Sequence, residues 1–336
     1  MNQPSIFKLP DLNGKEILIT GGLGFIGSNL AHRCLQLGAN VTIYDSLATN
    51  SGGNLFNISE IKNDVKLIFS DILDFNEVVH AIYGKDIIFN CAASTSHPQS
   101  MNQPFLDLDV NSKGLLILLE ASKRFNKQIK FVHIGTSTQL GSLRYRPADE
   151  SHPEFPTDIY SANKSVSEKY AIIYSKAYDM DICVIRLSNV FGPRACIHSP
   201  EFTFNNYFIG LALQEKSITV YKPGEQLRNV IYVDDAVEAL ILASLTDKTN
   251  KETFFAVGNE HYSIKQIAEE TVKNIGRGKV DYIDWPKERK AIEIGDAVIS
   301  NKKISEVLSW SPTISLEVGL IKTRDYYSSC LEQYIK

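Results

Sequence analysis

The stretch Gly21-Gly22-Leu23-Gly24-Phe25-Ile26-Gly27 decides how the first part of this chain folds. It follows the apolar run 17–20 directly and opens into a helix-like segment at 28–37. A strand that turns into a helix on glycines directs backbone N–H groups and the positive end of the helix dipole to one point, where a pyrophosphate fits. Glycines at this spacing also occur in plain tight turns, so the prediction needs support from the surrounding sequence.

Asp45 supplies that support. It ends the next apolar run, 41–44, and lies 18 positions after Gly27, where a carboxylate accepts hydrogen bonds from an adenosine ribose. No Lys or Arg occurs from 46 to 61 to hold a 2′-phosphate. We therefore predict a dinucleotide site that takes NAD rather than NADP. The residues expected at this site are Gly21, Gly24, Phe25, Ile26, Gly27 and Asp45.

Composition excludes several classes of function. The chain has 336 residues, 43% of them hydrophobic, and a net charge of −4, which permits a large core and gives no broad basic surface for nucleic acid. Residues 1–10 lack the apolar core of a signal peptide, and no apolar run approaches the roughly 20 residues of a membrane span. We expect a cytoplasmic protein that has no membrane partner.

The cysteines and histidines give no pattern that requires a disulfide or a metal. Five cysteines show no paired spacing, and an odd count argues against a disulfide framework. The seven histidines form no HxxxH or HxH arrangement, so no metal is expected.

Short β-rich runs alternate with longer helical patterns through the first half of the chain. The runs are 17–20, 41–44, 65–69, 86–90, 130–134 and 182–187, and the helical patterns are 25–37, 74–83, 104–125 and 158–178. This alternation, with strands apolar on both faces, predicts an α/β fold with a Rossmann-type, doubly wound parallel sheet.

After residue 193 the rhythm changes. Residues 194–228 look irregular, a helix is expected from Asp234 or Asp235 to about 244, a buried strand at 254–257, and further helices at 264–275, 302–308 and 315–332. We predict that 1–190 form the NAD-binding domain, with 229–257 returning to it. Residues 191–228 and 258–336 would form a smaller α/β substrate lobe with a cleft between the two.

Tyr160 and Lys164 are the pair that suggests chemistry. They stand at the start of a predicted helix, and the i, i+4 spacing puts the phenol and the ammonium on one face. A free tyrosine has a pKa near ~10, but a lysine cation and an oxidised nicotinamide would favour its phenolate. Tyr160 would then take a hydroxyl proton, and Lys164 would bind the nicotinamide ribose.

A hydroxyl cluster, Thr136-Ser137-Thr138, follows the strand 130–134. A hydroxyl at this strand end can bridge a substrate oxygen and the tyrosine oxygen. Ser and Thr after a strand also serve plain turn chemistry, and the residues alone leave both interpretations open.

Taken together in order, these motifs resemble the extended short-chain dehydrogenase/reductases, in particular the NAD-dependent nucleotide-sugar epimerase/dehydratase family. The resemblance covers essentially the whole chain. Its further motifs are Asp71-Ile72, Ala92-Ala93, Asn111, Arg186-Leu-Ser-Asn189-Val-Phe-Gly192-Pro193 and Arg228-Asn-Val-Ile-Tyr-Val-Asp234-Asp235. Several independent motifs in sequence are more specific than any one of them.

The resemblance implies roles for residues that would otherwise read as surface or turn positions. Asp71 and Ile72 would contact adenine, Ala92 and Ala93 would line the dinucleotide, and Asn111 would support its nicotinamide side. Asn189, Arg228 and Arg289 would hold the diphosphate of a nucleoside-diphosphate sugar, and a guanidinium fork suits phosphate oxygens. The resemblance also implies a homodimer formed through the helices that follow Asn111 and begin near Tyr160.

The family shares oxidation of a sugar carbon, usually C4, and diverges afterwards. Related 4,6-dehydratases carry Asp-Glu after the hydroxyl residue and decarboxylases a Glu two places later, whereas here Ser137 and Thr138 follow Thr136. Elimination needs a base on the C5 proton, which unperturbed hydroxyls do not provide. We therefore expect an isomerase, a 4-epimerase working through a 4-keto sugar.

Two alternatives stay open. A dehydratase or decarboxylase would need a carboxylate from elsewhere in the fold, and a non-catalytic NAD-binding sensor is a remote third possibility. The sequence does not fix the base, the sugar, or inversion at C4 against C2. The segment 195–206, where the sugar would be held, shows no interpretable pattern.

Overall fold

A seven-stranded parallel sheet forms the centre of the computed structural model, which describes residues 11–49, 51–286 and 294–335. The strand order is β10-β6-β5-β4-β1-β2-β3, and every neighbouring pair is parallel. The strands are β1 Glu16–Thr20, β2 Asn40–Asp45, β3 Val65–Phe69, β4 Ile87–Asn90, β5 Lys130–Thr136, β6 Ile182–Leu187 and β10 Thr253–Ala256. The order 3-2-1-4-5-6 is that of a doubly wound dinucleotide-binding sheet, so the predicted fold class is confirmed.

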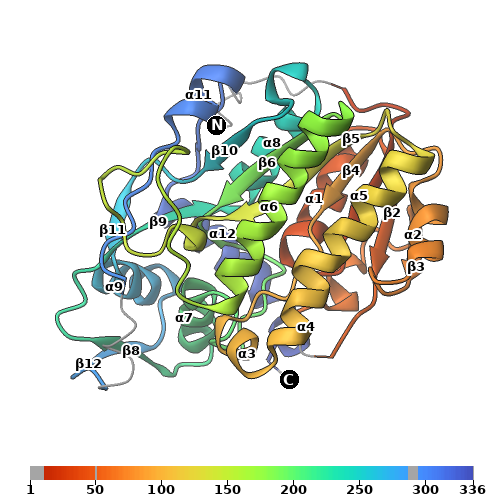
Figure 1. Ribbon diagram of the computed structural model, residues 1–336. Helices are drawn as coiled ribbons and strands as arrows, with labels where there is room; N and C mark the ends of the chain where they lie inside the picture. The colour runs from red at the N-terminus through yellow and green to blue at the C-terminus, as the bar shows by residue number, and fades with distance from the viewer. Residues whose placement is uncertain (1–10, 50, 287–293, 336) are drawn as a thin grey trace.

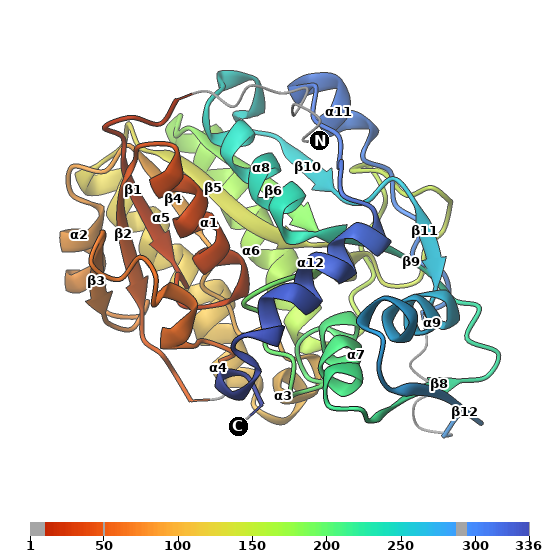
Figure 2. The same ribbon diagram turned by 180° about the vertical axis from the view of Figure 1, so that it is seen from behind.

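Helices cover both faces of the sheet (Figures 1 and 2). One face carries α2 Phe75–Ile82, α5 Gly114–Phe125 and α6 Ile159–Tyr178, and the other carries α1 Phe25–Gln36 and α8 Val233–Ser244. Successive strand residues point to opposite faces, so Leu18 joins the core under α5 while Ile17 and Ile19 join the core under α1. Both faces are apolar, which is why the strands read as continuous hydrophobic runs.

The helix starts follow from local capping. Asp74 and Asp158 accept backbone N–H groups at the starts of α2 and α6, and Ser263 forms a capping box with Gln266 at the start of α9 Ile264–Ile275. The predicted helix 104–125 is instead three pieces. They are α4 Pro104–Leu108, a π-helical turn at Asp109–Lys113, and α5.

The region after β6 is more regular than the sequence suggested. Residues 194–228 contain α7 Phe204–Leu213 and strand β8 Ser217–Tyr221. Strand β8 pairs with β12 Lys279–Ile283, whereas β7 Asn189–Phe191, β9 Leu227–Tyr232 and β11 His261–Ser263 form a three-stranded sheet. These strands are short and their partners lie far along the chain, so a local pattern does not reveal them.

The remaining elements are short or peripheral. They are α3 His97–Asn102, α11 Lys302–Leu308 and α12 Leu316–Ser328, with 3₁₀ turns at Leu55–Ile58, Ser137–Leu140, Asp247–Thr249 and Leu331–Gln333. Within the described ranges, no helix has the length and apolar character needed to cross a bilayer.

Asp235 ties the C-terminal segment to the first turn of α8. Its buried carboxylate accepts hydrogen bonds from the Thr313 backbone N–H and hydroxyl, both at 3.0 Å, and from the Ile314 N–H at 2.9 Å. Burial raises the pKa of this carboxyl, and the hydrogen bonds oppose that shift. The contact therefore fixes the chain that leads into α12.

We predict that Asp235→Ala lowers the free energy of unfolding by about 3 kcal/mol, because three hydrogen bonds to a buried carboxylate are lost. Asp235→Asn keeps one oxygen acceptor and should lose about half as much. Urea denaturation followed by circular dichroism measures both. An unchanged midpoint for the alanine variant would show that the tie contributes nothing.

Candidate functional site

The glycine loop between β1 and α1 approaches the end of β4 so closely that a side chain does not fit. Gly21 has φ +65°, and a Cβ there would lie 2.7 Å from the Ala92 nitrogen. A Cβ on Gly27 would lie 2.3 Å from the Gly21 carbonyl oxygen. Gly24 begins α1, and among the residues that the structure describes no side chain caps this end. The first turn thus presents its N–H groups to the space above the sheet.

Asp45 holds this loop in place. One carboxylate oxygen accepts the Leu23 N–H at 2.9 Å and the other accepts the Leu47 N–H at 2.8 Å. Burial raises the pKa of the carboxyl, and the two backbone hydrogen bonds act against that rise. The residue therefore has a structural role that its position in the sequence did not indicate, at the place predicted for ribose recognition.

A cleft of about 1440 Å³ lies above the carboxyl ends of the strands. This volume exceeds the roughly 300 to 1,000 Å³ of an ordinary small-molecule pocket, so there is room for two ligands. Nearly all the residues expected from the sequence line it. They are Gly21, Gly24, Phe25, Ile26, Gly27, Asp45, Asp71, Ile72, Ala92, Ala93, Thr136, Tyr160, Lys164, Asn189 and Arg228.

One expected residue is not on the cleft wall, and another lies outside the described residues. Asn111 is buried in the π-helical turn, and its side-chain amide donates to the Ser94 carbonyl at 2.9 Å. The backbone carbonyl of Asn111 accepts the Ser167 hydroxyl at 2.6 Å. The π turn frees that carbonyl from the helix ladder, and Ser167 satisfies it. Within the described part of the chain the Asn111 Oδ1 has no hydrogen-bond partner. Arg289 lies outside the described residues.

Tyr160 and Lys164 lie side by side on the first turns of α6 and are both buried. The Lys164 ammonium donates to the Ile134 carbonyl of β5 at 2.6 Å. Burial lowers the pKa of Lys164 to about 8. Burial also raises the pKa of Tyr160, with the Thr136 hydroxyl acting in the opposite direction.

The sequence had suggested that the lysine together with an oxidised nicotinamide would favour the phenolate. The folded chain by itself does the reverse, because burial outweighs every favourable neighbour of the phenol. A phenolate at neutral pH therefore needs a further positive charge above the tyrosine.

Hydroxyl groups link β5 to α6 beside the phenol. The Thr136 and Thr138 oxygens are 3.1 Å apart, and the Ser161 hydroxyl donates to Thr138 at 3.0 Å. Ser137 lines the same wall. This arrangement can hold an alcohol or carbonyl oxygen, and none of its members is a carboxylate.

The opposite wall comes from segments that follow β6 in the chain. Asn189 donates to the Asn229 carbonyl at 3.0 Å, and the Arg228 Nη1 donates to the Gly295 carbonyl at 2.7 Å. The aromatic rings of Tyr221 and Trp285 pack 4.6 Å apart on this wall. Segment 195–206 lines the cleft through Ala195, Cys196, Pro200, Glu201, Phe202, Thr203, Phe204 and Asn206. Backbone contacts thus fix Asn189 and Arg228 at the predicted diphosphate side.

Sequence reasoning missed one polar pair in the cleft. The His97 Nδ1 lies 2.8 Å from an Asp158 carboxylate oxygen, and the His97 ring packs edge-on against Tyr160. Ser96 before it and Pro98 after it mark the start of a helix, which is a signal that the sequence does contain. Nothing local indicated that this start would meet the start of α6.

The sequence matches the family model described as GDP-mannose 4,6 dehydratase over residues 18–323. It is 30% identical to UDP-glucuronic acid decarboxylase 1 of Xenopus tropicalis, across 98% of this chain and 76% of that protein. It is 28% identical to UDP-glucose 4-epimerase of Mycolicibacterium smegmatis, across 92% and 97% of the two chains. The chain belongs to this family of extended short-chain dehydrogenase/reductases.

The solved structures agree with that assignment. A dTDP-glucose 4,6-dehydratase from Bacillus anthracis in complex with NAD superposes with a TM-score of 0.82 at 26% identity, over 96% of this chain and 99% of that one. The three relatives catalyse a decarboxylation, an epimerisation and a dehydration, as their names state. Membership of the extended short-chain dehydrogenase/reductases therefore gives the fold and the nucleotide-sugar enzyme class, and leaves the reaction to be argued from the site. No group of three or more acidic, Cys or His side chains suited to a metal occurs in the described ranges.

The depressed pKa of Lys164 predicts a pH dependence of stability. The folded protein binds this proton less tightly than the unfolded chain, whose lysine has the usual pKa of 10.5. The unfolded chain is therefore the more protonated state between pH 8 and 10.5, and stability rises with pH across that window. Relative to Lys164→Met, the wild type should gain about 1 kcal/mol between about pH 7 and about pH 9.

Urea denaturation of both proteins at the two pH values measures this difference. Lys176→Met, which changes an exposed lysine of the same helix, is the matched control and should show no such gain. Parallel pH profiles of the wild type and Lys164→Met would show that the ammonium is not desolvated as described.

Proposed function

We propose that this protein is an NAD-dependent epimerase that inverts C4 of a nucleoside-diphosphate sugar through a 4-keto intermediate. The observation that carries the proposal is the buried Tyr160–Lys164 pair beside a cluster of hydroxyls, at the carboxyl ends of β4, β5 and β6. These side chains can transfer a proton at one carbinol oxygen. The two positions after Thr136, where related dehydratases carry the carboxylates for elimination, are Ser137 and Thr138.

The cleft fits NAD. The loop at Gly21 and Gly27 leaves no room for side chains, the uncapped turn at Gly24 offers N–H groups to a pyrophosphate, and Asp45 lies where a ribose hydroxyl would meet its remaining lone pairs. Asp71 and Ile72 would border the adenine, and Ala92 and Ala93 the middle of the dinucleotide. Bound NAD would supply the hydride acceptor and donor.

The chain's own residues would perform the proton chemistry. Tyr160 would take the proton of the sugar hydroxyl, and its pKa would fall toward the working range only when a cationic ring lies above the phenol. Lys164 would keep its ammonium between the Ile134 carbonyl and a ribose hydroxyl. The Thr136 hydroxyl would hold the sugar oxygen beside the phenol. Asn111, buried behind the wall, would act on the nicotinamide side only through the segment at Ser94.

The diphosphate would lie against Asn189 and Arg228, with Arg289 a further proposed contact. A guanidinium already oriented by backbone carbonyls loses little side-chain entropy when it binds a phosphate. The names of the relatives contain UDP and dTDP sugars, which supports a nucleoside-diphosphate sugar as the substrate class.

A lyase reaction is the second candidate. The decarboxylase and dehydratase relatives match this chain about as well as the epimerase does. Such a reaction would begin with the same oxidation and would need a base near the neighbouring carbon. The hydroxyls at Ser137 and Thr138 favour the epimerase.

We also propose the assembly and the division of the chain. Helices α5 and α6 have no other helix packed over their outer surfaces (Figure 1). A homodimer is supported by apolar residues of these helices that are exposed, since Phe125 is 51% exposed and Ile173 55% exposed. The division into 1–190 with 229–257 against 191–228 with 258–336, and a cytoplasmic location, remain predictions.

Mass spectrometry and NMR of a sugar panel test the reaction. Purified protein with NAD would be incubated with UDP-glucose, UDP-N-acetylglucosamine, dTDP-glucose, UDP-glucuronic acid and GDP-mannose. We expect a product of unchanged mass with an inverted sugar carbon. Loss of water or of carbon dioxide would replace the epimerase by a lyase.

Replacing Tyr160 with Phe tests the assigned residue. The variant should lose turnover by a factor of about 10² to 10⁴, because proton transfer to and from the sugar oxygen disappears, while NAD still binds in a calorimetric titration. Tyr83→Phe, at a tyrosine that is 78% exposed, is the control and should retain activity. Full activity of Tyr160→Phe would remove the phenol from the mechanism.

A further inference from the structure

An imidazole and a carboxylate form a fixed pair at the mouth of the cleft. His97 is the first residue of α3 and Asp158 is the N-cap of α6, and His97 Nδ1 lies 2.8 Å from one Asp158 oxygen. The other Asp158 oxygen accepts the Ser161 N–H at 2.8 Å. The side chains are 37% and 17% exposed. Both Asp158 oxygens thus form hydrogen bonds, and the one with Nδ1 orients the His97 ring.

The second ring nitrogen of His97 faces a different environment. His97 lines the cleft, and in the part of the chain that the structure describes its Nε2 has no hydrogen-bond partner. The ring centroid lies 4.8 Å from that of Tyr160, with the planes at 75°. The imidazole is therefore a neighbour of the phenol in space, although it is not hydrogen-bonded to it.

The hydrogen bond between the two side chains acts on the carboxyl as well as on the ring. Burial raises the pKa of Asp158, but its hydrogen bond with His97 helps to leave that pKa below its usual value. A carboxylate bound to Nδ1 selects the tautomer with the proton on Nδ1, so Nε2 presents a lone pair. The other acidic groups near α3 are Asp107, which is hydrogen-bonded to Asn163, and Glu201, which accepts the Ser96 hydroxyl.

We infer that His97, oriented by Asp158, is a second proton-transfer residue of this cleft, which enolises the keto sugar at a carbon next to C4. Nε2 takes the proton from that carbon, the C–H electron pair becomes a C=C bond, and the carbonyl pair moves onto O4. The imidazolium then returns a proton to the carbon, and the ketone is restored. No further reactant is required.

The geometry gives the enolate a partner. The raised pKa of Tyr160 keeps its hydroxyl protonated in the folded chain, so the phenol can donate to O4 as negative charge develops there. The phenol that accepts the proton in the oxidation would therefore stabilise the oxygen in the enolisation. His97 packs on Tyr160, so a sugar whose O4 meets the phenol would have its neighbouring carbons near the imidazole.

This role changes what the cleft can do. The bases expected from the sequence were carboxylates, either after Thr136 or from elsewhere in the fold, whereas α3 brings an imidazole from 39 positions earlier in the chain. Enolisation is the step that inversion at a neighbouring carbon and loss of a β-hydroxyl both require. The inference rests on the proposed function only in that its substrate is the 4-keto sugar.

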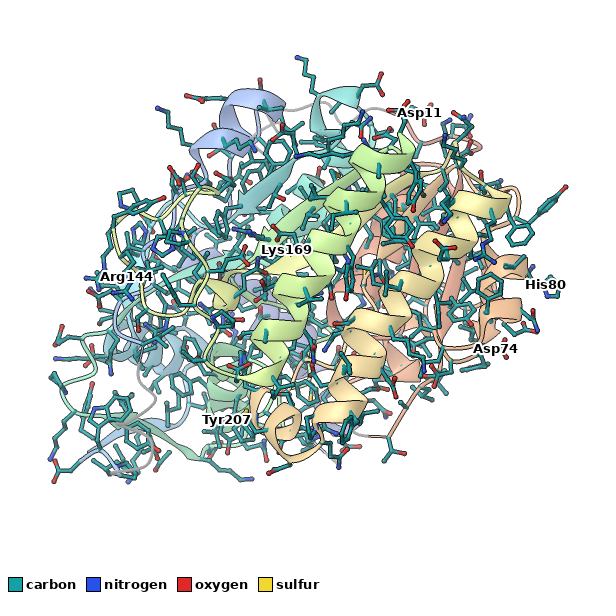
Figure 3. All side chains as sticks on the ribbon, in the orientation of Figure 1. Asp11, Asp74, His80, Arg144, Lys169 and Tyr207 are labelled. Atoms are coloured by element: carbon teal, nitrogen blue, oxygen red, sulfur yellow. The ribbon has the colours of Figure 1, made fainter. Side chains whose placement is uncertain are left out.

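Hydrogen exchange on a preformed keto sugar tests the inference without the oxidation step. dTDP- and UDP-4-keto-6-deoxyglucose would be incubated with the NAD-loaded protein in D₂O, and deuterium at the carbons next to C4 would be followed by NMR. We expect exchange faster than in buffer, and His97→Gln should slow the enzymatic rate by about 10² or more. His80→Gln, at an exposed histidine that projects from α2 into solvent (Figure 3), should match the wild type.

Asp158→Asn separates positioning from folding. Asparagine is an equally good N-cap, so α6 should keep its start, while the charge that orients His97 is lost. We expect exchange to fall about tenfold with an unchanged melting temperature. In parallel, inversion of the panel sugar should remain detectable in His97→Gln, because Tyr160 and Lys164 perform the oxidation.

Three results would overturn the inference. They are a wild-type exchange rate no faster than buffer, equal exchange in wild type and His97→Gln, or loss of both exchange and sugar inversion in His97→Gln, which would make His97 a support for Tyr160. Absence of sugar inversion with every member of the panel would instead refute the proposed function, and the keto-sugar exchange would still decide the role of His97.

Discussion

The hydrogen bond from the Lys164 ammonium to the Ile134 carbonyl fixes the start of α6 against the end of β5. The positions of Tyr160, Asp158 and Ser161 all depend on this contact, because they lie within the first turns of the same helix. An ammonium placed in a buried site is unfavourable for the fold, and the lowered pKa of Lys164 expresses that cost. The chain thus retains an unfavourable charge where the resemblance places the chemistry.

The second constraint is the contact between the glycine loop and the end of β4. Strands β1 and β4 are neighbours in the sheet, yet the connections from them leave toward opposite faces, and ligands in such sheets bind where this reversal occurs. Gly21 can approach Ala92 only because it has no side chain, and Asp45 braces the loop from β2. Three strands therefore build one half of the cleft.

The shared fold and the different reactions of the relatives follow from this arrangement. Tyr160, Lys164 and Thr136 stand on the rigid sheet and its first helix turn, whereas the second wall comes from segment 195–206, β8 and the region near Arg228. Residues on rigid elements suit the oxidation that we propose as the shared first step. Residues on loops and short helices would then select among epimerisation, dehydration and decarboxylation. His97, on the six-residue helix α3, belongs to the second group.

The amino-acid sequence by itself determined the parallel sheet and its helices, and it predicted the residues proposed for the redox site. These depend on local signals, namely strand runs that are apolar on both faces, a glycine turn, and the fixed i, i+4 geometry that places Tyr160 and Lys164 together. The resemblance added residues that have no local signal, such as Ala92 and Asn189. Only the tertiary structure decided that Asn111 lies behind the cleft, that Asp45 supports the glycine loop, that β8 pairs with β12, and that His97 meets Asp158. Those contacts join positions far apart in the chain, so no local pattern reveals them. The Tyr160 phenol becomes buried only when the chain folds, and this burial raises its pKa.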